Sequence, residues 1–158
     1  MMFAPPPKYV YLAGPITGTT QEGKSWREYV SQRFAEDILP LSPTRDIADT
    51  TDDYPLTIEK MKHGKEVLAR DRFDVSRCEL LLVNLMNAQR VSIGTVGEVF
   101  WADAMRKPVV LVIEAQPIHN PHFHLMLLEI ASWVFNDLDS AIGKINLLLS
   151  DCRSTLSS

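Results

Sequence analysis

Ser92-Ile-Gly-Thr-Val-Gly-Glu-Val-Phe-Trp-Ala102 is the stretch around which this chain is organised. It follows an apolar run at residues 80–85 and a polar loop at residues 86–91, and it predicts a helix over residues 95–106. A strand, a glycine-bearing turn and a helix start form the place where α/β proteins bind ligands and phosphates. We expect Glu98 in the first turn of this helix. There the positive end of the helix would keep the carboxylate ionised, as a nucleophile requires.

The same residues have a purely structural interpretation. Thr95 and Glu98 fit a capping box, in which the two side chains satisfy each other's backbone donors and only start a helix. Gly94 and Gly97 favour the functional interpretation. Gly97 stands inside the helix start, where glycine costs about 0.5–1 kcal/mol relative to alanine, and a bare backbone is useful there if a ligand must approach closely.

Outward from this stretch, apolar runs alternate with amphipathic segments. The runs predict strands at residues 8–13, 39–42, 79–85, 108–114 and 133–135. Helices are expected at residues 23–39, at 58–75 with a possible break at Gly64, and at 125–131 and 138–149. This alternation predicts a single α/β domain with a parallel sheet covered on both faces. We place the domain at residues 8–150, between a disordered tail at 1–7 and a flexible tail at 151–158.

Composition excludes several classes of protein. The net charge of -4 over 158 residues gives no basic surface for nucleic acid. No apolar run approaches the roughly 20 residues that span a bilayer, and the start of the chain lacks the pattern of a signal peptide. Cys78 and Cys152 lie far apart and have no metal-binding spacing, so we expect reduced thiols in a cytoplasmic protein.

One motif points to a different function. The stretch from Gly18 to Ser25 matches the P-loop pattern G-x-x-x-x-G-K-[ST]. Three features argue against a nucleotide triphosphate site. The preceding strand is expected to end four residues too early, Glu22 would place a negative charge in the phosphate cradle, and the strand at 79–85 carries Asn84 where an aspartate should hold magnesium.

Two further residues lie where a parallel sheet binds its ligands. Tyr11 lies near the carboxyl end of the first strand, and Asp71 comes shortly before the strand at 79–85. Each has an ordinary alternative. Tyr11 fits a core aromatic residue, and Asp71, between Arg70 and Arg72, fits a solvated helix face.

Together, three motifs resemble the nucleoside 2-deoxyribosyltransferase-like family. They are Tyr11-Leu-Ala-Gly-Pro15, Arg70-Asp-Arg-Phe-Asp74 and Ser92-Ile-Gly-Thr-Val-Gly-Glu98, and the resemblance covers about residues 8–135. The family contains transferases that exchange bases between deoxynucleosides and N-glycosidases that hydrolyse nucleoside 5′-monophosphates. The resemblance implies a flavodoxin-like or Rossmann-like three-layer sandwich with a five-stranded, mostly parallel sheet.

The resemblance also implies roles for the three residues already singled out. Glu98 matches the family's nucleophile, Tyr11 the tyrosine that holds it, and Asp71 the aspartate that assists the leaving base. This chemistry is coherent, since two carboxyl groups on either side of a glycosidic bond are what retaining glycosyl transfer requires. No metal and no other cofactor are implied.

Substrate contacts are expected from Gly14, Ser92, Gly94, Thr95 and His124. Many base-exchanging members carry an aspartate at the position of Ser92, whereas in the monophosphate hydrolases a serine there binds phosphate. In some members an asparagine of a neighbouring subunit completes the site, and here Asn120 or His124 could match it, with His124 preferred.

Three functions therefore stay open. The first is a deoxyribosyltransferase that acts through a covalent sugar–glutamate intermediate. The second is a nucleoside 5′-monophosphate N-glycosidase, and the third is a non-catalytic nucleotide-binding module. The expected partners are nucleosides or nucleotides, free bases and a second copy of the chain, which would share active sites in a homodimer or larger homo-oligomer.

Overall fold

The computed structural model describes residues 5–16, 21–45 and 64–150. Five short apolar runs form one sheet in the order β2-β1-β3-β4-β5, and every neighbouring pair is parallel. Strands that are mostly apolar along their length and buried on both faces are typical of such sheets. The strands are β1 (Lys8–Ala13), β2 (Ile38–Leu41), β3 (Leu80–Asn84), β4 (Val109–Val112) and β5 (Trp133–Phe135).

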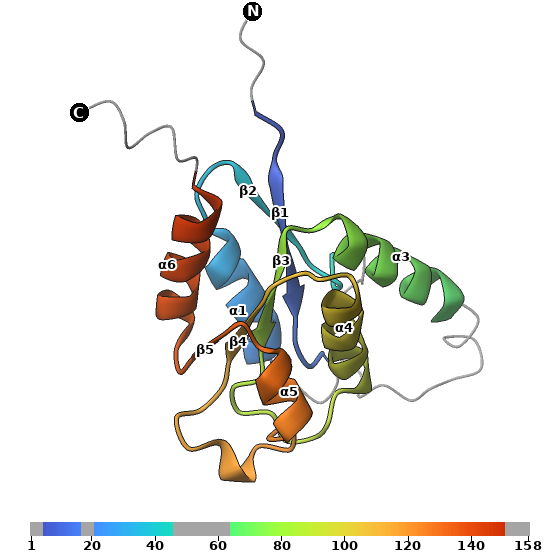
Figure 1. The fold of residues 1–158 in the computed structure, drawn as a ribbon, viewed down its shortest axis with the longest axis vertical. Helices are drawn as coiled ribbons and strands as arrows, with labels where there is room; N and C mark the ends of the chain where they lie inside the picture. Colours follow the sequence, from blue (N-terminus) through green and yellow to red (C-terminus); the bar gives the residue numbers. More distant parts are fainter. Residues whose placement is uncertain (1–4, 17–20, 46–63, 151–158) are drawn as a thin grey trace, which may run out of the picture.

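Helices cover both faces of the sheet (Figure 1). α1 (Gln21–Ser31) and α6 (Leu138–Leu149) lie on one face, and α3 (Gly64–Arg77), α4 (Ile93–Ala104) and α5 (Leu125–Ile130) lie on the other. A 3-10 turn, η1 (Pro117–His119), follows β4. Along β1 the side chains alternate: Val10 and Leu12 pack towards α1 and α6, whereas Tyr11 and Ala13 pack in the core beneath α3 and α4. The three-layer α/β fold expected from the sequence is confirmed.

The sequence-based boundaries hold to within a few residues except for the first helix. α1 ends at Ser31 and not near residue 39, and Ile38 already begins β2. Phe34 and Ala35, in the connection, pack against the same core as α1, so the apolar spacing continued past the helix end. Pro40 is accommodated because β2 is an edge strand, where a missing N–H is tolerated.

Some expectations fall outside the described residues. They include most of the two predicted tails, residues 58–63 of a predicted helix, Cys152 and the beginning of the P-loop-like stretch. The later part of that stretch belongs to α1, which begins at Gln21. In the described part of the chain, no helix is long and apolar enough to cross a membrane.

Gly14 lies where the strand order reverses, between the carboxyl ends of β1 and β3, which is the usual ligand edge of such sheets. A Cβ atom on Gly14 would lie 2.8 Å from the carbonyl oxygen of Asn84 and 3.1 Å from Cζ2 of Trp26. The first of these neighbours is backbone and cannot move aside as a side chain can. The close approach of β1 to the end of β3 therefore requires glycine.

Replacing Gly14 with alanine is expected to lower the free energy of unfolding by about 1–3 kcal/mol, because the added methyl group overpacks a backbone contact. Chemical denaturation measures this change. Gly143→Ala is the matched control, since a Cβ there meets nothing within 4 Å and the position is helical. The control should be neutral or gain up to about 1 kcal/mol, and an equal loss in both variants would contradict the steric account.

Candidate active site

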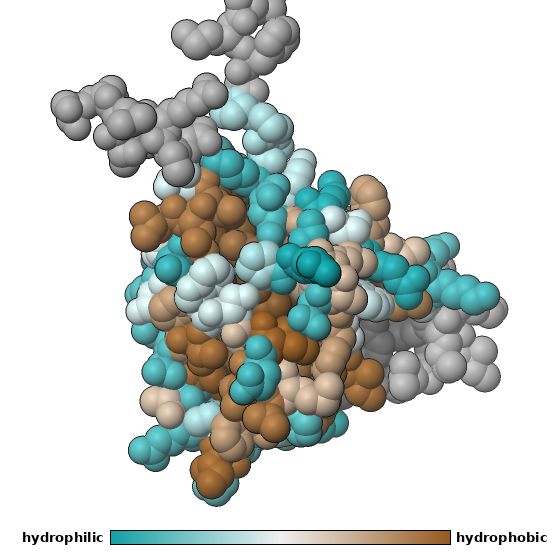
Figure 2. Space-filling view, in the orientation of Figure 1, coloured by the Kyte–Doolittle hydropathy of each residue, from teal (hydrophilic) through white to brown (hydrophobic). Residues whose placement is uncertain are grey.

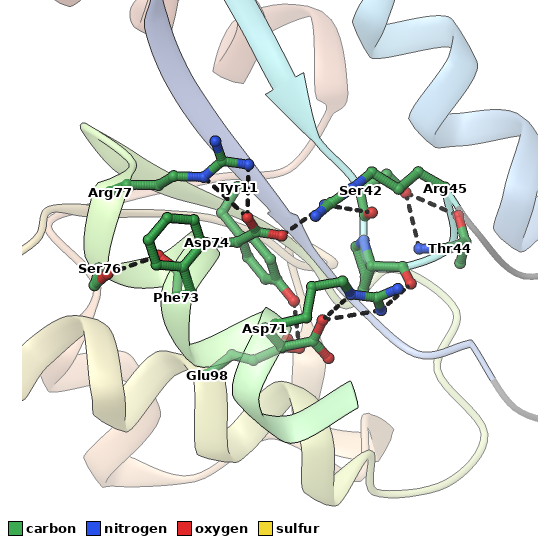
Figure 3. Close-up of polar contacts among 12 residues, drawn as sticks. Tyr11, Ser42, Thr44, Arg45, Asp71, Phe73, Asp74, Ser76, Arg77 and Glu98 are labelled. Carbon is green, nitrogen blue, oxygen red and sulfur yellow. Dashed lines mark hydrogen bonds and ion pairs between the residues drawn. The ribbon is translucent and has the colours of Figure 1, made fainter. Parts of the chain in front are cut away.

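A buried hydrogen bond joins β1 to α4 at the centre of the site. The Tyr11 hydroxyl donates to Oε1 of Glu98 at 2.7 Å, and both side chains are buried. Burial raises the pKa of Tyr11 far above its ordinary value, and the charges of Glu98 and Asp71 raise it further, so the phenol keeps its proton. Figure 3 shows Tyr11, Asp71 and Glu98 converging on one point from β1, α3 and α4. The structure thus brings the three expected catalytic residues together.

The start of α4 differs from the expectation. Ser92 is the N-cap, with its Oγ accepting from the Thr95 N–H, and Ile93 is the first helical residue. Glu98 therefore lies in the second turn, not in the first. The capping box between Thr95 and Glu98 is wrong too, because Ser92 does the capping and the Glu98 side chain reaches across to Tyr11.

The protonation of Glu98 also differs from the expectation of a carboxylate held ionised by the helix end. Its pKa is raised to about 7, first of all because the carboxyl is buried, with 7% of the residue exposed. The hydrogen bond from Tyr11 and the charges of Arg27 and Arg70 lower the pKa, while the charge of Asp71 raises it. Glu98 does not lie at the helix end, and burial is the largest influence on its pKa. It therefore titrates near neutral pH.

Asp71 is not on a solvated helix face. It is buried on the inner side of α3, and burial raises its pKa, against the opposing effect of Arg70. Arg70 donates to Asp71 Oδ1 through Nε at 3.1 Å and Nη2 at 3.0 Å, and Nη2 also donates to the Pro43 carbonyl at 2.7 Å. A carboxyl with a raised pKa is suited to hold and release a proton.

One turn further along α3, Asp74 is fully buried and forms two ion pairs. Its Oδ1 accepts from Arg77 at 2.8 Å, and its Oδ2 lies 2.6 Å from Nη1 of Arg45, in the segment that follows β2. Figure 3 shows Arg45 and Arg77 approaching Asp74 from opposite sides. Together with the bond from Arg70 to Pro43, this pair fixes the segment after β2 against the helix that carries Asp71.

Sequence reasoning missed Arg27. It is 3% exposed on the inner face of α1, and its guanidinium stacks on Trp26 with 4.5 Å to the ring centroid. Its Nη2 donates to the Gly14 carbonyl at 2.9 Å. Burial lowers the pKa of Arg27 to about 10, so it stays charged at neutral pH. The available signal was a cation three positions before Val30 on the apolar face of a predicted helix.

The expected substrate-contact residues lie in different surroundings. Ser92, Gly94 and Thr95 occupy the N-terminal turn of α4, and a Cβ on Gly94 would meet open space. Thr95 is buried, and its N–H is already bonded to Ser92 Oγ. His124 is exposed and caps α5, where its Nδ1 accepts from the Met126 N–H.

Of the two candidates for the residue shared between subunits, Asn120 is buried and bonded within its own chain. Its Nδ2 donates to the Leu85 carbonyl at 2.7 Å and to Glu114 Oε2 at 2.8 Å. His124 is therefore the better placed of the two to meet another molecule. His122, also missed by sequence reasoning, is almost fully buried and accepts a hydrogen bond from the Ser92 N–H.

A small cavity lies behind α4, between the helix and the sheet, with Thr95, Val99 and His122 in its wall. Its volume of about 10 Å³ is too small for a nucleoside, and its lining does not include Tyr11, Asp71 or Glu98. Among the residues that the structure describes, no group of three or more His, Cys, Asp and Glu side chains could hold a metal ion.

Comparisons with known proteins point to one family. The family model described as nucleoside 2-deoxyribosyltransferase matches residues 10–141. Among solved structures, a 2-desoxiribosyltransferase from Leishmania mexicana is similar, with a TM-score of 0.65, 19% identity, and coverage of 91% of this chain and 100% of that one. A 2-deoxyribosyltransferase from Bacillus psychrosaccharolyticus gives a TM-score of 0.63 at 18% identity, covering 92% and 94%.

A third solved structure of the same fold is the CMP N-glycosidase BcmB from Clostridium botulinum. Its TM-score is 0.52 at 19% identity, with 90% of this chain and 100% of that one covered. No curated protein sequence matches the chain. The likeness in structure shows a shared fold, and the family model connects that fold to the sequence.

Glu98→Gln is expected to stabilise the protein at pH 8 but not at pH 4. The pKa of Glu98 is raised from 4.5 to about 7 in the folded state, so its contribution to stability is fully present below about 4.5 and is lost as pH rises through about 7. Glutamine cannot ionise and escapes this loss, which is on the order of 3 kcal/mol at 1.36 kcal/mol per pKa unit. Denaturant unfolding of both proteins at the two pH values measures it, and a variant less stable at pH 8 would contradict the raised pKa.

Proposed function

The chain belongs to the nucleoside 2-deoxyribosyltransferase family, and we propose that it cleaves the N-glycosidic bond of a 2′-deoxynucleoside and transfers the sugar to another nucleobase. The observation that carries this proposal is the buried hydrogen bond from Tyr11 to Glu98. It fixes the orientation of the Glu98 carboxyl group through Oε1. The other oxygen, Oε2, is proposed to be the attacking atom, on the side of Asp71. Two carboxyl groups close together in a buried site are the arrangement used for retaining transfer at an anomeric carbon.

In the first half-reaction, ionised Glu98 attacks C1′ of the deoxyribose. The bond between C1′ and the base nitrogen breaks, its electron pair leaves with the base, and protonated Asp71 donates a proton to the base. The product is a deoxyribosyl ester of Glu98 and a free base. The raised pKa of Asp71 supports its role as the acid, since burial favours the protonated carboxyl.

In the second half-reaction, a nitrogen of the incoming base attacks C1′ from the side that the first base left. The ester bond breaks, Glu98 leaves as a carboxylate, and Asp71 takes up the proton that the new base releases. Tyr11 donates to Glu98 in both half-reactions, and Arg27 and Arg70 add positive charge that favours the ionised carboxylate. Two inversions at C1′ retain its configuration.

We assign the sugar's 5′ end to the N-terminal turn of α4, where Ser92, Gly94 and Thr95 lie. The open space over Gly94 permits close approach, and the positive end of a helix suits an oxygen-rich group. Gly14, at the carboxyl end of β1, is assigned to the opposite wall, near the ring of the sugar. In this arrangement the reacting C1′ lies between Glu98 and Asp71.

A second candidate function is hydrolysis of a nucleoside 5′-monophosphate, with water in place of the second base. The observation that favours it is Ser92 at a helix N-terminus, a position that suits a phosphate. The CMP N-glycosidase BcmB has the same fold and is consistent with this alternative. A non-catalytic nucleotide-binding module is a more distant third possibility.

The reaction is tested by incubation with deoxyadenosine or dAMP, with and without a second free base, followed by separation of the products. We expect a new nucleoside when the second base is present. Free base and deoxyribose 5-phosphate from dAMP would establish the hydrolase instead. No product from either substrate would contradict catalysis and support the binding module.

The same assay tests the assigned residues. Glu98→Gln should lose more than about 10³-fold in rate, or roughly 4 kcal/mol of barrier, because it cannot form the sugar ester. Asp71→Asn should also be slow. Asp103→Asn is the control, since Asp103 is exposed on the same helix as Glu98, and it should keep the wild-type rate.

We further propose that a second copy of the chain packs against α5 and the loop that precedes it. The observation is a group of exposed apolar side chains on both sides of His124. Figure 2 shows apolar surface over α5 and η1 at the lower end of the view. Large exposed apolar groups of this kind are typical of interfaces between chains. The residues concerned are Ile118, Phe123, Leu125 and Met126.

Leu125→Glu is expected to convert a dimer or larger assembly into monomers and to lower activity, because the variant places a charge in the interface. Sedimentation at micromolar concentration measures the assembly. Leu147→Glu, on α6, is a matched control because both leucines are 70% exposed. A wild-type protein that sediments as a fully active monomer would exclude a shared active site.

A further inference from the structure

A chain of hydrogen bonds begins at the carboxyl ends of β3 and β4. The Glu114 carboxylate accepts from the Asn87 N–H at 2.6 Å through Oε1 and from Asn120 Nδ2 at 2.8 Å through Oε2. Asn120 Nδ2 also donates to the Leu85 carbonyl. These bonds connect the loop that follows β3 to the loop that follows β4, at the edge of the sheet where the site lies.

The chain continues to the helix that carries Glu98. Asn120 Oδ1 accepts from the His122 N–H at 2.9 Å, His122 Nε2 accepts from the Ser92 N–H at 2.8 Å, and Ser92 Oγ accepts from the Thr95 N–H at 3.3 Å. His122 is only 2% exposed. The imidazole is therefore the link between the hydrogen-bonded loop that follows β4 and the N-cap of α4.

We propose that His122 is a positioning residue whose Nε2 fixes the Ser92 backbone, and with it the N-terminal turn of α4, where the substrate's 5′ end binds. The inference rests on the proposed function, since it deepens the assignment of that subsite. His122 does not touch the substrate in this arrangement. It acts through Ser92, which it holds in place as the loop at residues 86–91 enters the helix.

The direction of the hydrogen bond determines the form of the imidazole. Since Nε2 accepts from an N–H, the proton of neutral His122 must be on Nδ1. A doubly protonated ring would present a donor to the Ser92 N–H, and the bond would be lost. Protonation of His122 therefore releases the N-cap of α4.

The surroundings of His122 keep the ring neutral. Burial lowers its pKa. The side chains that line the small cavity with His122 come from β3 and the residue after it, and from α4, β4 and α5, and none of them is charged: all are apolar except Thr95. Glu114 is the carboxylate of the hydrogen-bond chain, and it bonds to Asn120, not to the imidazole.

Nδ1 of His122 is buried and has no hydrogen-bond partner among the described residues. An unpaired buried N–H costs about 1–3 kcal/mol. A phenylalanine ring would avoid this cost but would leave the Ser92 N–H without its acceptor. What the imidazole adds is the acceptor for Ser92.

Two variants separate the acceptor from the volume of the ring. His122→Gln can place an oxygen near the position of Nε2 and keep the bond, whereas His122→Phe keeps a ring and removes the acceptor. At pH 7.5, in the deoxyadenosine and dAMP assays, the Phe variant should have a KM at least about tenfold higher, equivalent to about 1.4 kcal/mol, with a smaller effect on kcat. The Gln variant should restore KM to within about threefold of wild type.

The pH dependence of KM is a measurement that a purely structural role of His122 would not change. The KM of wild type should rise as pH falls through the pKa of His122, which burial holds below the ordinary 6.5, while the KM of the Gln variant should lack this component. A Phe variant that is folded, active and unchanged in KM would overturn the inference. So would a wild-type KM whose dependence on pH matches that of the Gln variant.

A measurement independent of activity separates this inference from the proposed function. Long-range ¹H–¹⁵N spectra of the histidine-labelled protein, assigned with the Gln variant, should show His122 protonated at Nδ1 and not at Nε2 at neutral pH. Protonation at Nε2 would disprove the hydrogen bond whatever the activity. If the expected form is found but no glycosidic bond is cleaved, the proposed function fails, and the role in substrate binding fails with it.

Discussion

The hydrogen bond from Tyr11 to Glu98 connects residues 87 positions apart and depends on most of the fold. It requires β1 and β3 to be parallel neighbours, with Tyr11 opposite Leu81, and it requires α4 to return over the face that Tyr11 occupies. The close contact of Gly14 with the end of β3 sets the same edge of the sheet. A parallel α/β sheet brings the carboxyl ends of its strands to one edge, so distant parts of the sequence can meet there without a long loop.

Burial determines the pKa of Glu98 and also lowers the stability of the protein near neutral pH. Removing Glu98 from water raises its pKa to about 7, which disfavours the ionised form that the proposed attack on C1′ requires. The Tyr11 hydroxyl and two arginines offset part of that effect, and Asp71 opposes them. In the proposed mechanism, the buried carboxylate has lost hydration and is held by a fixed donor, the Tyr11 hydroxyl, which suits a nucleophile. Stability near neutral pH is lowered for the same reason.

Much of the fold could be predicted from sequence because apolar runs of four to six residues form the buried strands, and the three motifs placed Tyr11, Asp71 and Glu98 together. The end of α1 could not be predicted from sequence, because Phe34 continues the helical spacing beyond the helix. The start of α4 could not be predicted either, because Ser92 and Thr95 are both suitable N-cap residues and only the backbone conformation distinguishes them. Arg27, Asp74 and His122 were missed because a polar residue's burial depends on partners far along the chain: the Gly14 carbonyl, Arg45 and Ser92 respectively.

The proposed mechanism requires a covalent bond between Glu98 and the sugar, and trapping that intermediate is the direct test. A 2′-fluoro-substituted nucleoside should slow both half-reactions, because fluorine destabilises the positive charge that develops at C1′, and the sugar ester accumulates when its breakdown is the slower step. We predict that protein denatured during turnover carries one fluorosugar on the peptide that contains Glu98, as measured by mass spectrometry. An adduct on another residue, or none in a protein that still turns the compound over, would contradict the claim.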